Sequence, residues 1–595
     1  MCGILGYIGN KQAQPILLNC LQKLEYRGYD SCGIAIADSR LMVFKDEGRV
    51  EALAKLAPHL KGSRGIGHTR WATSGEPSRI NAHPHCDCTG NIAVVHNGVI
   101  NNCLKLRQKL TAEGHILISE TDTELIPHLI EKYYTGNLEI AVKTALRDLE
   151  GSYAIIVLMT GTPELVAARK DSPLIIGIGD KENFIASDVP SILGYTNRII
   201  YLEDGDTVAV TTDKIKVMRE EAEITRHVHK ILWNLEDTKK SGYEHFMLKE
   251  IHEQPRVIRD ILNGYISAAR AAVDSAMVLK PDLESILISA CGSSYHAALV
   301  GKYIIEELLR IPVRAEPAPE FNCQSPIIAK SGAIAITQSG ETADTLNTMK
   351  ILKERGCPVL AITNVMGSTA SRIADQTIYT RAGPEISVAA TKSFTAQLIV
   401  LYLLSISHSK ADSKRLANLL LGLRQLPKKI QQILNNEEEI IKYAKYLSRY
   451  EDVFLIGRGL NLPVAFEGAL KLKEIAYIHA EGYTAGALKH GSFALLGRNT
   501  PVIAMVVQDS THKAMLTNIK EIKARGAPLM VLAAENGDNE VEKIADTVIR
   551  VPQIDLLLSP VINTLAIQLL AYYTAVHRDC PIDYPRNLAK SVTVE

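Results

Sequence analysis

Residues 1 to about 218 contain short apolar runs separated by turn residues. Four of these runs have the length of strands: Cys32–Ala37, Gly65–Trp71, Ile92–Val95 and Tyr153–Leu158. Between the runs, apolar residues recur at the three-to-four spacing of a buried helical face, at 16, 17, 20, 21 and 24 and again across 125–130. This mixture of strands and helices predicts an α+β domain over residues 1–218.

Residues 219–275 are rich in charged side chains and include a helical segment around 246–251. We expect this stretch to be mostly helical, and to connect the first domain to the next through entry helices. The pattern then changes again after Pro281.

From there, short apolar strands alternate with helices. The alternating segments are Ile286–Ala290, Tyr295–Leu309, Ala333–Thr337, Thr345–Arg355 and Val359–Thr363. Such alternation predicts a parallel sheet with helices on both faces, that is, a doubly wound α/β domain.

The second half of the chain contains this domain twice. Arg355-Gly356 recurs as Arg525-Gly526, and Gln397-Leu398 recurs as Gln568-Leu569, in each case about 170 residues later. The glycine after the first strand of each copy, Gly292 or Gly457, fits the same repeat. We therefore expect one copy at 276–416, a second at 444–585, and a tail at 586–595.

Composition narrows the range of partners. Of 595 residues, 46% are hydrophobic and 22% are charged, as in ordinary soluble globular proteins. Lys plus Arg and Asp plus Glu are both 66, so no net positive field points to nucleic acid or to an anionic membrane surface. Ten cysteines without a signal peptide or a long apolar run indicate reduced thiols in the cytoplasm, and we expect no disulfide framework.

The start of the chain offers a candidate nucleophile. If Met1 is removed, Cys2 carries both a thiol and a free α-amine, and the amine titrates near pH ~8 and can accept a proton at neutral pH. The plainer interpretation is that Cys2 is a small apolar residue at the start of a strand.

Four polar clusters accompany Cys2 in the first domain. They are Arg27–Ser31, His68–Thr73, His96–Gly98 and Ser119–Glu124. The side-chain amide of Asn97 and the N–H of Gly98 can both point at one oxyanion, Arg70 can grip a carboxylate, and Asp122 can balance an ammonium. Taken singly, Asn-Gly is also a common hairpin turn, and an isolated Arg or Asp is usually a surface residue.

The segment 83–88, His-Pro-His-Cys-Asp-Cys, packs four possible metal ligands into six residues. Structural zinc sites usually take two separated pairs of ligands, and Pro84 stiffens the loop. We therefore expect a structural loop here and no metal site.

Together, Cys2-Gly3-Ile4, the four clusters and Asn81–Pro84 resemble the glutamine amidotransferase domain of the N-terminal-nucleophile type, over the whole first domain. The resemblance implies that Cys2 attacks the glutamine carboxamide, that Asn97 and Gly98 form the oxyanion hole, and that Arg70 and Asp122 hold glutamine. It also implies an ammonia gate at Trp71 and substrate contacts from Thr73 and His83.

In the second half, polar residues follow two neighbouring strands of the first copy, as Cys291–Ser294 and Thr337–Thr342. Glycines, hydroxyls and helix N-termini at the carboxyl ends of parallel strands suit a phosphate group. The alternative is that the hydroxyls only cap the helices. The second copy lacks the full set of hydroxyls, so we expect only the first copy to bind phosphate.

The second copy has a charged helix instead, Pro463–Tyr477, with Glu467, Lys471 and Glu474 on one face. This stripe is either a solvated ion-pair row or an acid/base group facing a sugar. His490, in a loop flanked by glycines, is a further candidate.

The paired copies, Glu467–Glu474, Lys489–Gly491 and the tail Pro585–Glu595 resemble the sugar isomerase domains of the glucosamine-6-phosphate synthase family. The resemblance implies an α+β N-terminal-nucleophile amidotransferase domain followed by two α/β doubly wound parallel-sheet sugar isomerase domains. It also implies a cytoplasmic homodimer that makes glucosamine 6-phosphate from fructose 6-phosphate and L-glutamine, without metal or organic cofactor.

The same resemblance assigns roles to individual residues. Glu474 moves a proton between C1 and C2, His490 helps to open the ring, and Lys590 forms a Schiff base with the open sugar. The residues expected to bind the sugar phosphate are Ser294, Thr337, Gln338, Ser339, Thr342, Glu385, Val388 and Lys471. We expect the tail to fold over the two sugar isomerase copies and to bury Lys590.

Four positions depart from the family pattern: Ser74, Ala390, Ala487 and Ser492. None removes a catalytic group, although Ala390 puts one sugar contact in doubt. Two alternatives therefore stay open. One is an amidotransferase acting on a different phosphorylated keto sugar, and the other is a non-enzymatic sugar-phosphate sensor, which would have no use for Cys2, Glu474 and Lys590 together.

Overall fold

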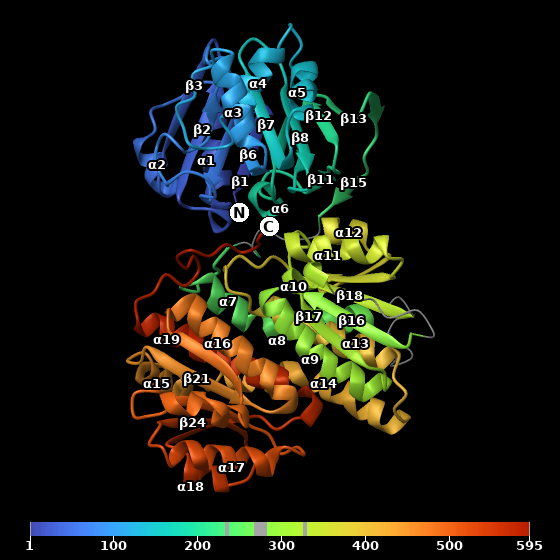
Figure 1. Cartoon of the computed structure of the whole chain (residues 1–595), viewed down its shortest axis with the longest axis vertical. Coiled ribbons are helices and arrows are strands. Elements are labelled where there is room, and N and C mark those ends of the chain that lie inside the picture. Colours follow the sequence, from blue (N-terminus) through green and yellow to red (C-terminus); the bar gives the residue numbers. More distant parts are fainter. Residues whose placement is uncertain (1, 232–236, 238, 267–282, 325–329, 594–595) are drawn as a thin grey trace. The chain divides into compact units, whose positions relative to one another are not determined.

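The computed structural model describes residues 2–231, 237, 239–266, 283–324 and 330–593. These residues form two compact units. The first comprises residues 1–238 together with 589–595, and the second comprises residues 239–588 (Figure 1).

The first unit contains two antiparallel sheets. The strands of the first sheet, in their order across it, are β15 (Val228–Lys230), β11 (Arg198–Tyr201), β9 (Ile175–Ile178), β10 (Glu182–Ala186), β1 (Gly3–Gly9), β4 (Arg64–Arg70), β2 (Ser31–Ala37) and β3 (Leu41–Glu47). Those of the second sheet are β14 (Ala222–Ile224), β13 (Ile215–Arg219), β12 (Asp206–Val210), β8 (Leu165–Lys170), β7 (Gly151–Met159), β6 (Ile92–Ile100) and β5 (His85–Cys86).

Helices cover the outer faces of these sheets. They are α1 (Ala13–Gln22), the 3-10 turn η1 (Glu25–Arg27), α2 (Val50–Leu56), α3 (Cys103–Ala112), α4 (Leu125–Tyr133), α5 (Leu138–Arg147) and α6 (Val189–Ile192). Alternation along β1 explains the layering. Ile4 and Ile8 enter the core between the two sheets, whereas Leu5 and Tyr7 enter the core beneath α1. The predicted α+β domain is confirmed.

The expectation of a mostly helical segment at 219–275 is wrong for its first part. Strands β13, β14 and β15 extend the two sheets of the first unit as far as Lys230. β14 and β15 are short, polar strands at sheet edges, and β13 is a five-residue strand beside β14, so the sequence carries only a weak strand signal here. Helices appear only at α7 (Phe246–His252) and α8 (Gln254–Tyr265), and residues 267–275 lie outside the described residues.

The second unit contains two parallel sheets of five strands each. The first is ordered β17 (Val313–Pro317), β16 (Ser285–Ala290), β18 (Ser331–Thr337), β19 (Val359–Thr363) and β20 (Gln376–Tyr379). The second is ordered β22 (His479–Thr484), β21 (Asp452–Gly457), β23 (Val502–Val506), β24 (Leu529–Ala534) and β25 (Thr547–Val551). The identical strand order confirms the internal repeat and the doubly wound architecture.

The helices of this unit also correspond between the copies (Figure 1). The first copy and the region after it contain α9 (Gly292–Leu309), α10 (Ala318–Gln324), α11 (Ala343–Glu354), α12 (Thr369–Ile373), α13 (Lys392–Ser407), α14 (Ser413–Leu434) and α15 (Glu438–Leu447). The second copy contains η3 (Gly459–Asn461), α16 (Leu462–Ala476), η4 (Ala487–His490), η5 (Ser492–Leu495), α17 (His512–Lys523), α18 (Glu540–Ile544), η6 (Leu556–Leu558) and α19 (Ser559–His577).

One hydrophobic core includes residues of both copies, with the corresponding helices α13 and α19 at its centre. Among the described residues, Leu556–His577 is long and apolar enough to cross a membrane, yet 89% of its most apolar window is buried within the protein. That burial is typical of a core helix. The described cysteines, apart from the unassigned Cys323, are free thiols.

Candidate functional site

Cys2 lies immediately before β1, and the pairing of β1 with β4 brings it beside Trp71. The Trp71 N–H donates to the Cys2 Sγ at 3.2 Å, and the thiol donates to the Trp71 carbonyl at 3.4 Å. Burial raises the pKa of the Cys2 thiol, while the N-terminal positive charge, the Trp71 amide and Arg70 oppose that rise. The thiol therefore needs a base if it is to react as a thiolate.

Asn97, which belongs to β6, lies next to Cys2. Its Nδ2 donates to the Cys2 carbonyl at 2.8 Å, and its Oδ1 lies 3.2 Å from His68 Nε2, which fixes the orientation of the amide. An amide nitrogen carries two N–H donors, so a second one remains for a ligand. Gly98 has a φ of +136°, and a Cβ there would lie 2.1 Å from the Ser152 carbonyl, so only glycine fits.

Arg70, at the end of β4, is buried and shapes the loop that follows it. Its guanidinium donates to the carbonyls of Ser74, Gly75 (2.9 Å) and Glu76 (3.4 Å). This loop carries Trp71, which is half-buried, and Thr73, which is exposed. Some donors of Arg70 are thus used within the chain, and its role as a carboxylate clamp stays a prediction.

The predicted ammonium partner, Asp122, is buried, and its carboxylate accepts the Ile100 N–H at 2.8 Å. Arg27 is a neighbour of Cys2 to which the sequence analysis gave no role. Its Nε donates to the Cys2 carbonyl at 3.4 Å, and its Nη1 donates to Asp188 at 2.7 Å. Arg27 belongs to the polar cluster Arg27–Ser31, and that cluster is the sequence feature that could have identified it as a neighbour of Cys2.

Three histidines form a buried cluster near Asn97, in which His68 and His83 stack and His85 meets His83 edge to face. The ring of His83 lies 4.0 Å from that of His68 and 4.9 Å from that of His85. Burial lowers the pKa of His68 to about 3, and it lowers the pKa values of His83 and His85 well below the usual range. His83 is therefore neutral and 5% exposed, and its predicted substrate contact stays a prediction.

In the second unit, the turn between β18 and α11 carries the predicted phosphate residues. The hydroxyls of Thr337 and Thr342 lie 3.0 Å apart, the Gly340 N–H donates to Thr337 Oγ1 at 3.2 Å, and the Glu341 N–H donates to Ser339 Oγ at 3.1 Å. Thr342 is the N-cap residue of α11 but makes no side-chain cap hydrogen bond. The hydroxyls therefore do not serve as helix caps, the main alternative to ligand binding.

The neighbouring strand end contributes Ser294, in the first turn of α9. Its Oγ accepts a hydrogen bond from Gln397 Nε2 at 2.9 Å, and the N-terminus of α9 again has no side-chain cap. Gln338, between Thr337 and Ser339, is half-buried, and its carbonyl accepts the Asn364 N–H at 3.1 Å. Both strand ends thus present backbone and side-chain donors at the same edge of the sheet.

The charged face of α16 is buried, so it is not a solvated row. Lys471 is 0% exposed, and its Nζ lies 3.3 Å from Glu467 and 2.5 Å from Glu474. Ser293 and His296 of α9 also bond Glu467, at 2.9 and 2.8 Å. Burial opposes charge on Lys471, but the two carboxylates raise its pKa above the usual value. Lys471 is therefore a cation held between two carboxylates. Ser293 and His296 connect this group to the first copy.

Three other predicted residues have different surroundings. Glu385 accepts the N–H groups of Thr391 and Ser393, both at 3.0 Å, and so supports the start of α13. Val388 is buried, and its N–H donates to the Asp583 carbonyl at 3.1 Å. His490 lies exposed on η4.

Lys590 is half-buried, and its segment groups with the first unit. The expectation that the tail folds over the sugar isomerase copies stays a prediction. Just before Lys590, Arg586 contacts the second unit. Its N–H donates to the Tyr477 hydroxyl at 2.7 Å, and its guanidinium lies over the Tyr477 ring.

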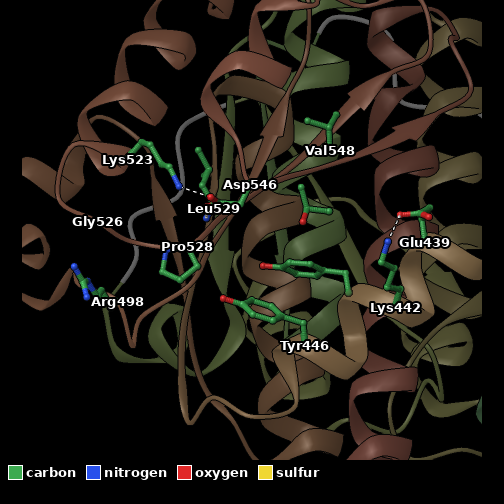
Figure 2. Close-up of a pocket in the computed structure, with 12 residues that line it drawn as sticks. Glu439, Lys442, Tyr446, Arg498, Lys523, Gly526, Pro528, Leu529, Asp546 and Val548 are labelled. Carbon is green, nitrogen blue, oxygen red and sulfur yellow. Dashed lines mark hydrogen bonds and ion pairs between the residues drawn. The ribbon is translucent and has the colours of Figure 1, made fainter.

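A cavity of about 640 Å³ lies elsewhere in the second unit (Figure 2). Residues at the amino ends of β24 and β25 form part of its lining, and Lys523 and Asp546, which also line it, form an ion pair. The predicted phosphate residues lie at carboxyl ends of strands in the other sheet. This cavity is therefore separate from the sugar-phosphate residues.

Two family models match the chain. The glutamine amidotransferase domain model matches residues 68–194, and the SIS domain model matches residues 282–407 and 446–578. These matches cover part of the first unit and most of both parallel-sheet copies of the second.

Curated relatives match over the full length of both proteins. Proteins named glutamine–fructose-6-phosphate aminotransferase (isomerizing) are 49% identical to the chain in Caldanaerobacter subterraneus, 47% in Pyrococcus horikoshii and 46% in Methanosarcina acetivorans, and coverage is 100% each way. A solved C-terminal domain of glucosamine-fructose-6-phosphate aminotransferase from Francisella tularensis is 35% identical. It covers 58% of this chain and 100% of its own, with a TM-score of 0.56. The chain therefore belongs to the isomerizing glutamine–fructose-6-phosphate aminotransferase family.

Proposed function

We propose that this chain converts D-fructose 6-phosphate and L-glutamine into D-glucosamine 6-phosphate and L-glutamate. The supporting observation is that one chain contains both a cysteine held beside Asn97 and, in its second unit, uncapped hydroxyl-rich strand ends with a buried acid–lysine group. The relatives that share this full-length arrangement are named for the reaction.

In the first unit, the Cys2 thiolate attacks the glutamine carboxamide carbon. The thiol proton passes first to the α-amine that Met1 removal exposes, and the amine later returns it to the departing nitrogen; Asn97 Nδ2 and the Gly98 N–H stabilise the developing oxyanion. Collapse of the tetrahedral intermediate breaks the C–N bond and releases ammonia, leaving a thioester on Cys2. Water then hydrolyses the thioester to glutamate, while Arg70 and Asp122 hold the amino acid end of the substrate.

In the second unit, the phosphate of the sugar binds at Thr337–Thr342 and Ser294. Lys590 forms a Schiff base with the C2 carbonyl of the open sugar, with loss of water, and ammonia displaces the lysine. Glu474 moves the proton from C1 to C2, which isomerises the product to the aldose form. Lys471, between Glu467 and Glu474, holds both carboxylates in position.

The product is an amino sugar phosphate, so we place the reaction at the first step of amino sugar biosynthesis, which leads to UDP-N-acetylglucosamine. We also propose that the protein works as a homodimer in the cytoplasm. The free thiols of nine cysteines fit a reducing compartment. The equal numbers of acidic and basic residues fit small polar substrates better than nucleic acid.

The test is to incubate the purified chain with glutamine and a panel of ketose phosphates, and to identify the aminated product by mass spectrometry. We expect glucosamine 6-phosphate from fructose 6-phosphate, in step with glutamate. Amination of another ketose phosphate in preference would support the alternative substrate, to which Ala390 and Ala487 are the only pointers. Binding of sugar phosphate without either reaction would support a sensor.

A further inference from the structure

Four side chains of the first unit that the proposed reaction does not use converge on one point. They are Cys88, His115, His128 and Glu131, and their ligand atoms all lie within 4.8 Å of one another. Cys88 Sγ lies 3.5 Å from His115 Nδ1 and 3.4 Å from His128 Nδ1. The Glu131 carboxylate lies 3.2 Å from His115 Nδ1 and 3.5 Å from His128 Nδ1.

These four separations match four of the six edges of a tetrahedral zinc site, and the two other pairs, sulfur to oxygen and nitrogen to nitrogen, lie within 4.8 Å. With Zn–S near 2.3 Å and Zn–N and Zn–O near 2.0–2.1 Å, tetrahedral geometry places sulfur about 3.6 Å from nitrogen and nitrogen about 3.3 Å from oxygen. The four measured distances differ from these values by about 0.2 Å or less. A cation at the centre would therefore reach all four ligands with little rearrangement.

The ligands come from three segments that the fold brings together. Cys88 lies in the loop between β5 and β6, His115 follows α3, and His128 and Glu131 occupy adjacent turns of α4. The i, i+3 spacing places His128 and Glu131 on one face of that helix. The expectation of a purely structural 83–88 loop rested on ligands within the loop, whereas the partners of Cys88 lie 27 to 43 residues further along the chain.

Burial and local hydrogen bonds also suit a bound ion. The side chains of His128, His115 and Glu131 are 2%, 13% and 21% exposed, whereas Cys88 is exposed and leaves a path for entry. The Cys88 N–H donates to the Glu131 carboxylate at 3.2 Å and so orients this ligand. His128 Nε2 is buried without a hydrogen-bond partner among the described residues, so the polar contacts of this ring are all made by Nδ1, on the side of the cluster.

We propose that Cys88, His115, His128 and Glu131 bind one zinc ion in a closed structural site. A thiolate, two imidazoles and a carboxylate in tetrahedral arrangement favour zinc over the harder ions that prefer only oxygen. Four protein ligands leave no open position for substrate. The ion would instead fix both ends of segment 115–128, which carries Asp122.

Metal content of the full chain is the direct test. Protein stripped with a chelator, given two equivalents of zinc and then desalted should retain about one zinc per chain by elemental mass spectrometry. Cys88→Ser and His128→Ala should each weaken zinc binding at least tenfold in competition with a chromophoric chelator. The matched controls Cys103→Ser and His59→Ala, outside the cluster in the same unit, should bind zinc as the unaltered chain does.

Cobalt(II) in place of zinc tests the geometry separately from affinity. We expect the strong visible bands of a tetrahedral ion and a thiolate-to-cobalt charge-transfer band, which should disappear in Cys88→Ser. Zinc should also raise the melting temperature of the unaltered chain but not of Cys88→Ser, because a ligand that binds only the folded state stabilises it. The proposal is overturned if the unaltered chain retains no zinc, if Cys88→Ser binds it equally well, or if cobalt shows no thiolate band.

Discussion

The ammonium of Lys471 lies 2.5 Å from the carboxylate of Glu474, on the same buried face of α16. The same nitrogen lies 3.3 Å from Glu467 and 3.1 Å from Ser293 Oγ, and Ser293 belongs to α9 of the other copy. One cation therefore orients the proposed proton shuttle and links the two sugar isomerase copies. Neither copy alone contains the complete group.

Replacing Lys471 by Met should leave two buried carboxylates without their cation. Breaking a buried ion pair by removing one partner costs about 3–5 kcal/mol, so the thermal transition of the second unit should fall by several degrees and isomerisation should be lost. Glutamine hydrolysis should persist, because it occurs in the first unit. Lys473→Met, at an exposed position on the same helix, is the control and should change neither property. Full isomerase activity in Lys471→Met would show that Lys471 is not needed to position Glu474.

The phosphate turn can be tested against its counterpart in the second copy. Replacing Ser339 and Thr342 by Ala removes two donors to a dianion, each worth about 1.5–3 kcal/mol, so affinity for fructose 6-phosphate should fall at least tenfold by calorimetry. Thr511→Ala, at the N-terminus of α17, should leave affinity unchanged, because only the first copy is expected to bind phosphate. Equal losses in the two variants would show that the turns act only in folding.

Lys590 is the proposed imine-forming residue. Lys590→Arg keeps the positive charge but cannot form the imine, so synthesis should be lost while glutamine hydrolysis by Cys2 survives. Borohydride added with fructose 6-phosphate should trap a hexose phosphate on the peptide that contains Lys590. Lys489→Arg, at an exposed site near His490, serves as control and should retain synthesis. An adduct on Lys471 or Lys489 instead would refute the assignment.

The buried histidine cluster predicts acid sensitivity of the first unit. The pKa of His68 is lowered to about 3, and those of His83 and His85 are lowered further below the usual range, so the folded state stays neutral where the unfolded chain protonates. Stability is therefore complete above pH ~6.5 and falls as pH decreases below it, by about 2 kcal/mol per histidine at pH ~5.

Urea unfolding followed by the fluorescence of Trp71, in a Trp233→Phe background, measures this loss directly. His83→Asn should reduce the change in stability between pH 7 and pH 5 by about a third, since one of three neutral histidines is removed. His59→Asn, at an exposed position, should leave the pH dependence unaltered. A pH dependence that is equal in both variants would show that His83 is protonated in the folded state.

The sequence predicted those features that depend on local pattern. The alternation of Ile286–Ala290 with Tyr295–Leu309 was enough to predict a parallel sheet. The recurrence of the same short motifs after an interval of about 170 residues was enough to predict two copies. The strands β14 and β15 were missed because short polar edge strands carry little hydrophobic signal.

Side-chain clusters that join distant segments could not be predicted in this way. The spacing of Glu467, Lys471 and Glu474 placed them on one helix face, but their burial depends on α9, which contributes Ser293 and His296. Cys88 similarly depends on α4 for its partners. Such groups arise where distant elements pack together, and local sequence periodicity does not predict which elements meet.

The central claim is that nitrogen released at Cys2 becomes the amino group of the sugar. The measurement is mass spectrometry of the products formed from amide-¹⁵N glutamine and fructose 6-phosphate in buffer containing unlabelled ammonium. We predict glucosamine 6-phosphate carrying ¹⁵N, in equal amount to glutamate, and no labelled amino sugar from Cys2→Ala, which should still isomerise the ketose phosphate. Glutamate without aminated sugar, or ¹⁵N incorporation that survives in Cys2→Ala, would contradict the account.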